Sequence, residues 1–279
     1  MKVCSIGIGL IGGSFALALK EHYAKAEIWG MDSSTTHLQE AVELGIIEGV
    51  ARMNQITDFD LVVISIPVDA IPAKVNEVLP LLNKNALVID MGSTKKNICE
   101  QLENHPRRNQ FLATHPIAGT EFSGPKASLS HLFEGALMIV CEAELTRKDL
   151  RQNAFEIFQQ MGMQLQLMQA KAHDQHLAYV SHLSHISSFM LGKTVLDLEK
   201  DEREIFRLAG SGFASTVRLA KSNPTTWSSI FKENKAEVLK SLRAYQANLS
   251  LIEEALNNED EEAVMQLLNS TSRIREIIK

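Results

Sequence analysis

The first 168 residues alternate short apolar runs with stretches of helical periodicity. The apolar runs cover residues 2–6, 27–31, 46–50, 61–66, 86–90, 111–112, 137–141 and 164–168, and helix-like stretches lie at 15–20, 35–44, 71–79 and 147–161. The central runs are apolar at nearly every position, which is typical of strands buried on both faces. Their alternation with helices predicts an α/β fold, a Rossmann-type doubly wound parallel sheet, over residues 1–169.

From residue 170 onward the strand pattern stops and helical periodicity takes over. Long amphipathic helices are expected at about 224–255 and 259–278, with apolar residues such as Val238, Leu239 and Leu242 at helical spacing. We therefore predict two domains, a Rossmann-like domain at 1–169 and an all-α domain at 170–279. The apolar stripe of the second domain is expected to serve packing or a dimer seam.

A glycine-rich turn joins the first strand to the first helix. It reads Gly7-Ile8-Gly9-Leu10-Ile11-Gly12-Gly13-Ser14, which is G-x-G-x-x-G between a strand and a helix. The three glycines permit a tight turn, approach of the backbone to a pyrophosphate, and close packing of helix on strand. The helix start then presents its N–H groups to the phosphates. The predicted cofactor contacts here are Gly7, Gly9, Leu10, Ile11 and Gly12.

An acidic residue ends the second strand in the position that a dinucleotide site requires. Asp32 lies twenty residues after Gly12, where a carboxylate accepts hydrogen bonds from the adenosine ribose. Ser33 and Ser34 follow, with no arginine to bind a 2′-phosphate. We therefore predict NAD as the cofactor in preference to NADP, against the alternative of a structural Rossmann unit that binds nothing.

Polar residues follow three of the predicted strands. Ser65 and Pro67, which we also predict as cofactor contacts, lie at the end of the run at 61–66. Ser93 follows the run at 86–90, and His115 follows Phe111-Leu112. Ligands of such sheets lie beyond the carboxyl ends of the strands, so these residues are expected to share one crevice. We expect His115, with Pro116 behind it, to lie where a strand passes into a loop. Such a histidine suits proton transfer, although an isolated histidine is more often structural.

The first helical stretch after residue 170 is rich in histidine. Taken at about 100° per residue, His173, Ser181 and His185 fall within one sector of roughly 120°, with His176 and His182 about 60° beyond its edges. This stripe is expected to face the first domain. Histidines three residues apart could also bind a metal, but no carboxylate partner lies on the same face, so we predict no metal site.

A second glycine-rich segment precedes an arginine. Gly210-Ser211-Gly212-Phe213 is followed by Arg218, one or two helical turns further on. A guanidinium offers a planar, two-pronged donor that suits a carboxylate. Arg218 is therefore a candidate anion anchor, with a surface salt bridge as the alternative.

Composition and charge narrow the partners. The 28 basic and 34 acidic residues give a formal net charge of −6, which argues against nucleic acid or an anionic membrane as the main partner. Cys4, Cys99 and Cys141 are widely spaced and odd in number, which predicts reduced thiols. The sequence shows no leader and no apolar stretch of membrane-spanning length. A cytoplasmic protein that binds a small molecule is expected.

Several motifs together resemble the prephenate dehydrogenase family of tyrosine biosynthesis, in family order and over nearly the whole chain. The motifs are Gly7 to Ser14, Asp90-Met91-Gly92-Ser93-Thr94-Lys95, His115-Pro116-Ile117-Ala118-Gly119-Thr120-Glu121, Ser181-His182-Leu183-Ser184-His185, and Gly212-Phe213 through Arg218. The His-Pro-x-x-Gly and Ser-His-x-x-His motifs are the most specific of these. One departure is Ser215, which stands where many relatives have an acidic residue.

The resemblance implies oxidative decarboxylation of prephenate by NAD to 4-hydroxyphenylpyruvate, with release of carbon dioxide. His115 would accept the proton of the C4 hydroxyl, and Ser93 would hydrogen-bond that hydroxyl or orient His115. By similarity, Arg218 pairs with the pyruvyl carboxylate. The other substrate-pocket residues implied are His173, His185, Ser181, Thr120, Glu121 and Trp227, and the helical domain would form a homodimer.

Three alternatives stay open. Arogenate dehydrogenase carries out the same chemistry on a substrate with an amine in place of the ketone. A β-hydroxyacid dehydrogenase shares the domain plan, but that family relies on a lysine and an asparagine on its first long helix, where this chain offers histidine and serine. A catalytically silent NAD-binding dimer module would make the combination of Ser93, His115 and Arg218 a coincidence.

Overall fold

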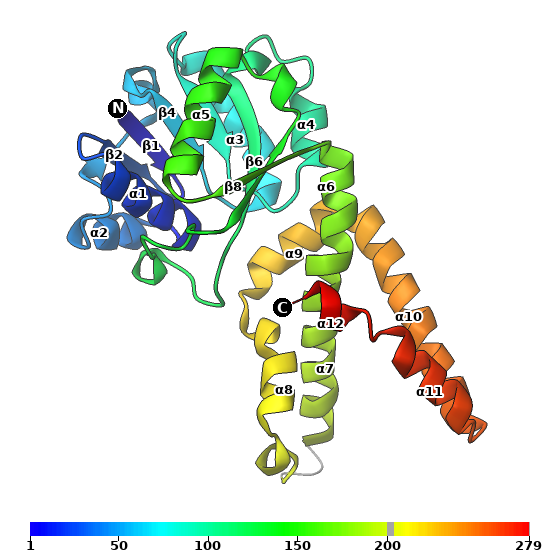
Figure 1. Cartoon of the computed structure of the whole chain (residues 1–279). Coiled ribbons are helices and arrows are strands. Elements are labelled where there is room, and N and C mark those ends of the chain that lie inside the picture. Colours follow the sequence, from blue (N-terminus) through cyan, green and yellow to red (C-terminus); the bar gives the residue numbers. More distant parts are fainter. Residues whose placement is uncertain (200–203, 279) are drawn as a thin grey trace. The chain divides into compact units, whose positions relative to one another are not determined.

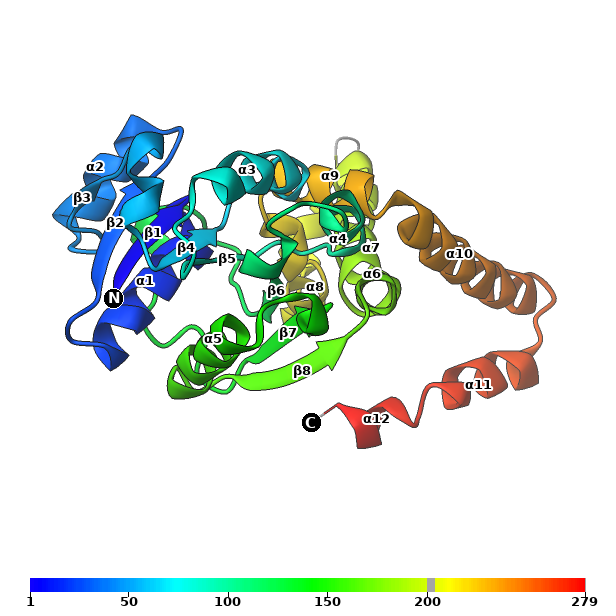
Figure 2. The same cartoon turned by 90° about the horizontal axis from the view of Figure 1, so that it is seen from above.

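Eight strands form one sheet in the order β3-β2-β1-β4-β5-β6-β7-β8, which Figure 2 shows from one edge to the other. The computed structural model describes residues 1–199 and 204–278. The strands are β1 (Lys2–Ile6), β2 (Glu27–Met31), β3 (Gly49–Val50), β4 (Leu61–Ile64), β5 (Leu87–Asp90), β6 (Phe111–Ile117), β7 (Leu137–Cys141) and β8 (Gln164–Met168). The order of the first six strands is the one typical of dinucleotide-binding domains, which confirms the predicted fold class.

Helices cover both faces of this sheet (Figure 1). They are α1 (Leu10–His22), α2 (Thr35–Glu43), α3 (Ile71–Val78), α4 (Lys96–Leu102) and α5 (Lys148–Gln160). Alternate residues of β4 enter separate cores, Val63 on one face and Val62 on the other. Phe15 of α1 meets Phe158 of α5 edge-on in the first core, with ring centroids 6.3 Å apart. Burial on both faces explains why the central strands read as continuous apolar runs.

The last two strands run against the other six. β7 pairs antiparallel with β6, and β8 pairs parallel with β7. The expectation of a sheet that is parallel throughout is therefore wrong for this edge. The physical reason is that an apolar run fits a buried strand equally well in either direction, so its pattern carries no information on polarity.

His115 lies within β6 and not after it, which corrects the expected position at a strand end. The pairing of β5 with β6 stops at Ala113, whereas β7 continues to pair with β6 through Ile117. His115 and Pro116 thus occupy a part of β6 that has a neighbour on one side only. The missing N–H of proline is tolerated best where the ladder is one-sided.

The helices after β8 are shorter and more interrupted than expected. They are α6 (Ala170–Leu177), α7 (Leu183–Glu199), α8 (Ser211–Thr216), α9 (Pro224–Glu233), α10 (Lys235–Asn257), α11 (Glu261–Ser270) and α12 (Ile274–Ile277). The predicted helix at 224–255 breaks at Asn234, whose side chain donates to the Asp174 carbonyl oxygen. The predicted helix at 259–278 breaks after Ser270, where Ser270 and Thr271 hydroxyls bond to nearby carbonyl groups.

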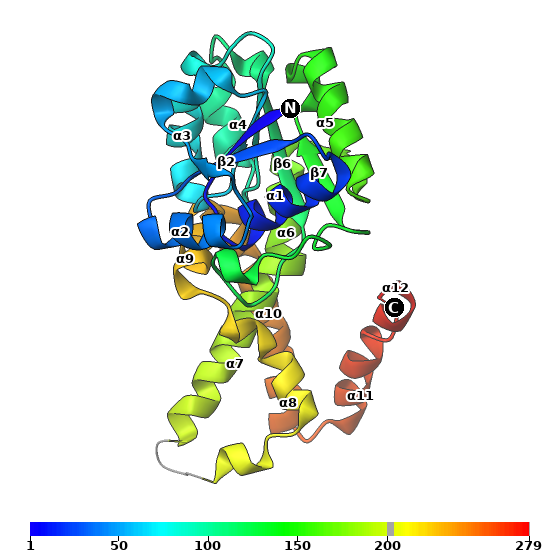
Figure 3. The same ribbon diagram turned by 90° about the vertical axis from the view of Figure 1, so that its left-hand side faces the viewer.

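A π-helical turn, η7 (Ala178–His182), joins α6 to α7. A π-helical turn has a smaller rotation per residue than an α-helix. The predicted stripe, which assumed about 100° per residue, is therefore wrong across this turn. His182, expected beyond the edge of the stripe, is buried, whereas Ser181 and His185 are half-buried. The segment that holds α8 returns along the chain direction of α7 (Figures 1 and 3), and the 3-10 turns on either side of α8 contact α7. The 3-10 turn η9 (Arg218–Lys221) is tied to α7 by Ser188, whose hydroxyl oxygen accepts the N–H of Ala220 at 3.0 Å.

The chain divides into two compact units, Met1–Asn234 and the residues from Lys235 onward. Leu177 of α6 and Ile230 of α9 belong to the same apolar core as β4 and β5, so these helices are part of the first unit. The predicted domain boundary at residues 169 and 170 stays a prediction. Across the described part of the chain, every helix is too short or too polar to span a bilayer.

Candidate active site

The glycine-rich turn after β1 has three different steric environments. Gly7 has φ +90°, and a Cβ there would lie 2.4 Å from the Ser65 carbonyl oxygen. A Cβ on Gly12 would lie 2.0 Å from the Gly7 carbonyl oxygen, so the helix could not approach the strand. A Cβ on Gly9 would meet no atom of residues 1–199 or 204–278 within 4 Å. The turn is therefore closely packed at Gly7 and Gly12 and open at Gly9. This is the arrangement that a bound pyrophosphate needs.

Asp32 is held beside this turn at the end of β2. Its carboxylate accepts the N–H groups of Ile8 and Ser34, each at 2.8 Å. Of the other predicted cofactor residues, Leu10 is buried, Ile11 half-buried and Pro67 exposed. The Ser65 hydroxyl is buried, lies close to Gly12, and has no hydrogen-bond partner among the described residues. The geometry fits a dinucleotide on this side of the sheet.

The loop between β6 and β7 returns to the glycine-rich turn. Leu129 donates its N–H to the Ser14 hydroxyl at 2.9 Å. A Cβ on Gly13 would lie 2.1 Å from the Ser128 hydroxyl oxygen. The fourth glycine of the motif therefore gives space to this loop, which begins after Ile117 at the end of β6.

His115 is held by a second histidine from the helical segment. Its Nδ1 lies 2.8 Å from Nε2 of His173, and the two rings meet edge-on. His115 is only 8% exposed and His173 is fully buried. Burial, reinforced by His173 and Lys95, lowers the pKa of His115 well below its ordinary value. A neutral imidazole is the form that can accept a proton.

Asp174 completes this cluster, and the sequence did not single it out. One carboxylate oxygen lies 2.7 Å from Nδ1 of His173 and 2.7 Å from the N–H of Lys95. The other accepts the N–H of Lys96 at 3.0 Å. The helical wheel showed no carboxylate on the same face as His173, since Asp174 is the next residue along the chain. The N–H groups that bond to Asp174 lie at the start of α4. No local sequence pattern indicates that the start of α4 contacts α6.

Ser93 lies in the turn between β5 and α4, two residues before Lys95. It is half-buried, and within the described residues it makes no hydrogen bond with His115. The bond that orients His115 comes from His173. A contact of Ser93 with a substrate hydroxyl stays a prediction.

Arg218 and Glu121 face each other across two separate segments. Nη1 of Arg218 lies 3.9 Å from a carboxylate oxygen of Glu121, and the arginine side chain is 55% exposed. Thr120 is exposed, and its hydroxyl accepts the N–H of Phe122 at 3.2 Å. The loop after β6, through Glu121, thus lies next to Arg218, the arginine that was predicted as an anion anchor.

His185 stacks on Trp227, with ring centroids 3.4 Å apart and planes inclined by 20°. Nδ1 of His185 lies 3.0 Å from the Ser181 carbonyl oxygen, so Ser181 contributes through its backbone. Burial lowers the pKa of His185, and the charge of Arg218 acts in the same direction. The predicted residues therefore form local groups: His115 with His173, Glu121 with Arg218, and His185 with Trp227.

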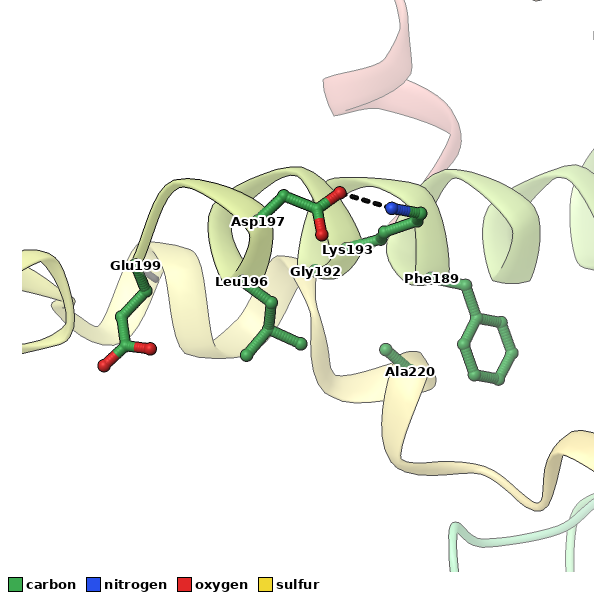
Figure 4. Close-up of a pocket in the computed structure, with 7 residues that line it drawn as sticks. All are labelled: Phe189, Gly192, Lys193, Leu196, Asp197, Glu199 and Ala220. Atoms are coloured by element: carbon green, nitrogen blue, oxygen red, sulfur yellow. Dashed lines mark hydrogen bonds and ion pairs between the residues drawn. The ribbon is translucent and has the colours of Figure 1, made fainter. Parts of the chain in front are cut away.

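A separate hollow of about 520 Å³ lies on α7 (Figure 4). It is lined by Phe189, Gly192, Lys193, Leu196, Asp197, Glu199 and Ala220. Lys193 and Asp197 form an ion pair one helical turn apart on its wall. None of the predicted site residues lines this hollow.

Two family models match the chain. Residues 15–167 match the nucleotide-binding domain of prephenate dehydrogenase, and residues 169–270 match its dimerization domain. The chain belongs to the prephenate dehydrogenase family.

Relatives of this prephenate dehydrogenase family member include solved structures. The prephenate dehydrogenase of Aquifex aeolicus, solved with hydroxyphenyl propionate and NAD+, is 33% identical with a TM-score of 0.90, covering 99% of this chain and 98% of that one. The arogenate dehydrogenase of Synechocystis is 25% identical with a TM-score of 0.79, and both chains are fully covered. The cyclohexadienyl dehydrogenase of Zymomonas mobilis is 28% identical over 280 residues, which are 99% of this chain and 96% of that protein.

Proposed function

We propose that the chain catalyses the NAD-dependent oxidative decarboxylation of prephenate to 4-hydroxyphenylpyruvate. The single observation that carries the proposal is His115: a buried, neutral imidazole with one ring nitrogen held by His173. The other nitrogen, Nε2, makes no hydrogen bond to any residue of the described ranges. It is free to accept the proton of a substrate hydroxyl.

The cofactor is NAD. Open space above Gly9 and the carboxylate of Asp32 are the features of this chain that fit it. When bound, NAD supplies the acceptor for the hydride that leaves ring C4 of the substrate. His115 takes the proton of the C4 hydroxyl as that carbon is oxidised, and loss of the ring carboxylate as carbon dioxide makes the ring aromatic. The protein contributes orientation and proton transfer.

Arg218 is proposed as the anchor of the substrate side-chain carboxylate. Its guanidinium is exposed and its contact with Glu121 is long, so it keeps donors for a ligand. His185 and Trp227 present a stacked pair of rings nearby in the chain's helical part. The relative from Aquifex aeolicus was solved with hydroxyphenyl propionate, a ligand that combines an aromatic hydroxyl with a carboxylate. The same combination of groups is present in the proposed product.

Arogenate is the second candidate substrate. The carboxylate of Glu121 lies beside Arg218, and an acidic group next to the carboxylate anchor suits the ammonium group of an amino acid. The arogenate dehydrogenase of Synechocystis supports this candidate. Both substrates require the same proton transfer to His115.

We also propose that the chain acts as a homodimer through its C-terminal helices. The match of residues 169–270 to a dimerization domain supports this. Large apolar side chains on α7 are exposed, among them Met190, Leu196 and Leu198, each at least half accessible. The molar mass in solution, measured by light scattering, tests the dimer directly.

One assay tests the proposed function. Formation of NADH or NADPH is followed with prephenate and with arogenate, each supplied with NAD and with NADP. The expected result is rapid reduction of NAD with prephenate. Reduction with arogenate alone would replace the substrate, and no reduction in any of the four combinations would overturn the proposal.

A further inference from the structure

We infer that Asp174 and His173 are positioning residues that fix which ring nitrogen of His115 carries a proton. The three side chains form one hydrogen-bonded row, from the Asp174 carboxylate through His173 to Nδ1 of His115. The inference rests on the proposed function, in which His115 accepts the proton of the substrate hydroxyl. Neither Asp174 nor His173 needs to touch the substrate for this role.

The row starts at a carboxylate that is kept ionised. Asp174 is 2% exposed, and burial alone would raise its pKa. The hydrogen bond and charge of His173, with the N–H groups of Lys95 and Lys96, outweigh burial and lower the pKa of Asp174. An ionised carboxylate only accepts hydrogen bonds, so Nδ1 of His173 must carry the hydrogen in the bond between them.

The state of His173 then decides the state of His115. Burial lowers the pKa of His173, with Asp174 acting in the opposite direction, so the ring is neutral near pH 7. With hydrogen on Nδ1, its Nε2 is an acceptor, and Nδ1 of His115 must donate to it. A neutral His115 that carries hydrogen on Nδ1 has its lone pair on Nε2. This is the nitrogen that makes no hydrogen bond within the described residues.

The row is anchored at its Asp174 end, so it fixes the ring of His173 as well as its tautomer. Asp174 is joined to the start of α4 through the N–H groups of Lys95 and Lys96. Its carbonyl oxygen accepts a hydrogen bond from Asn234 at 2.7 Å. Once His115 has taken a proton on Nε2, its Nδ1–H still points at the His173 acceptor, and the carboxylate beyond stabilises the positive charge.

Asp174→Asn should disturb the row. The carboxylate oxygen that faces His173 also accepts the N–H of Lys95, and the other oxygen accepts the N–H of Lys96, so the asparagine NH2 group meets an N–H donor in either orientation. His173 loses its ionised acceptor, and hydrogen on Nε2 of His115 is no longer excluded. In that tautomer His115 cannot accept the substrate proton. We expect kcat to fall on the order of 10²- to 10⁴-fold, with NAD binding unchanged.

The test combines kinetics with NMR of the full chain labelled with ¹⁵N-histidine, in which His115→Asn assigns the His115 signals. The wild type is expected to show hydrogen on Nδ1 of His115 alone, and Asp174→Asn to show it on Nε2 as well. If Asp174→Asn does not fold, His173→Leu and His173→Gln replace it. Leucine removes the acceptor and should abolish most turnover, whereas the glutamine carbonyl oxygen can accept from His115 and should restore part of it.

His176→Asn is the matched control, because His176 is exposed on the same helix and should leave kcat unchanged. Hydrogen on Nε2 of His115 in the wild type would overturn the inference. So would folded variants of Asp174 and His173 that keep full kcat. Lack of activity in the wild type would instead overturn the proposed function, and the tautomer measurement would still decide the positioning role.

Discussion

Lys95 and Asp90 form an ion pair in which neither side chain is exposed to solvent. Nζ of Lys95 also donates to the Thr114 carbonyl oxygen at 2.8 Å, one residue before His115. The carboxylate of Asp90 accepts the N–H of Gly92 at 3.0 Å. The pair therefore connects the end of β5, the turn that holds Ser93, and the part of β6 that holds His115.

Removal of the lysine charge should destabilise the fold strongly. Lys95→Met leaves the Asp90 carboxylate buried without its cation, and we expect the free energy of unfolding to fall by about 3–5 kcal/mol. Urea denaturation measures this loss. Asp90→Asn in the same chain should recover part of it, because the amide needs no counter-charge. A Lys95→Met protein as stable as the wild type would contradict the view that this ion pair stabilises the fold.

Stability should also depend on pH through His182. Burial lowers the pKa of His182 from 6.5 to about 4, against an opposing effect of Asp174. Because the unfolded chain keeps the ordinary pKa, it binds more protons than the folded chain between these values. The free energy of unfolding should therefore be constant above about pH 6.5 and fall as the pH drops toward about 4, by an amount on the order of 3 kcal/mol from this group.

Urea midpoints at about pH 7 and about pH 5 measure this dependence for the wild type and for His182→Gln, which cannot titrate. The variant should show a weaker fall, with the remainder due to His115, His173 and His185, whose pKa values are also lowered. His176→Gln, on the exposed side of α6, should behave as the wild type. An unchanged pH dependence in His182→Gln would contradict the prediction.

Gly13 should couple the glycine-rich turn to the loop after His115. Gly13→Ala places a methyl group 2.1 Å from the Ser128 hydroxyl oxygen, so the Ser128 side chain or the loop that holds it must shift, at a cost of about 1–3 kcal/mol. We expect weaker NAD binding, measured by fluorescence titration. Ser128→Gly in the Gly13→Ala background should restore much of the affinity. Normal binding by the single variant would show that the loop does not depend on this contact.

Arg218→Lys should mainly weaken substrate binding. Lysine keeps the charge but loses the planar pair of donors, so we expect KM for prephenate to rise on the order of tenfold with a smaller change in kcat. Arg243→Lys is the control, since Arg243 is exposed on α10. Steady-state kinetics distinguish the two constants, and an unchanged KM would remove Arg218 from the substrate site.

Much of the fold could be predicted because its signals are local. The glycines before α1, the acidic residue after β2 and the continuous apolar runs each depend on a few neighbouring residues. The direction of β7 could not be predicted, because an apolar run is equally buried in both directions. The position of His115 inside β6 follows from pairing with β7 and was missed for the same reason.

The site was predictable in part. The motifs that carry Ser93, His115 and Arg218 pointed to candidates, whereas Asp174 gave no signal because its partners are backbone N–H groups far away in the sequence. The π-helical turn before α7 shifted the histidine stripe and buried His182. The partners of Asp174 and the π-helical turn both depend on tertiary contacts, which helical periodicity does not predict.

The most direct test of the central claim is the turnover of His115→Asn with prephenate and NAD, followed as NADH formation. The account predicts a folded protein that binds NAD as the wild type does and loses turnover on the order of 10²- to 10⁴-fold. The same preparation is titrated with NAD to show that the cofactor site is intact. Turnover close to that of the wild type would contradict the assignment of His115 as the proton acceptor.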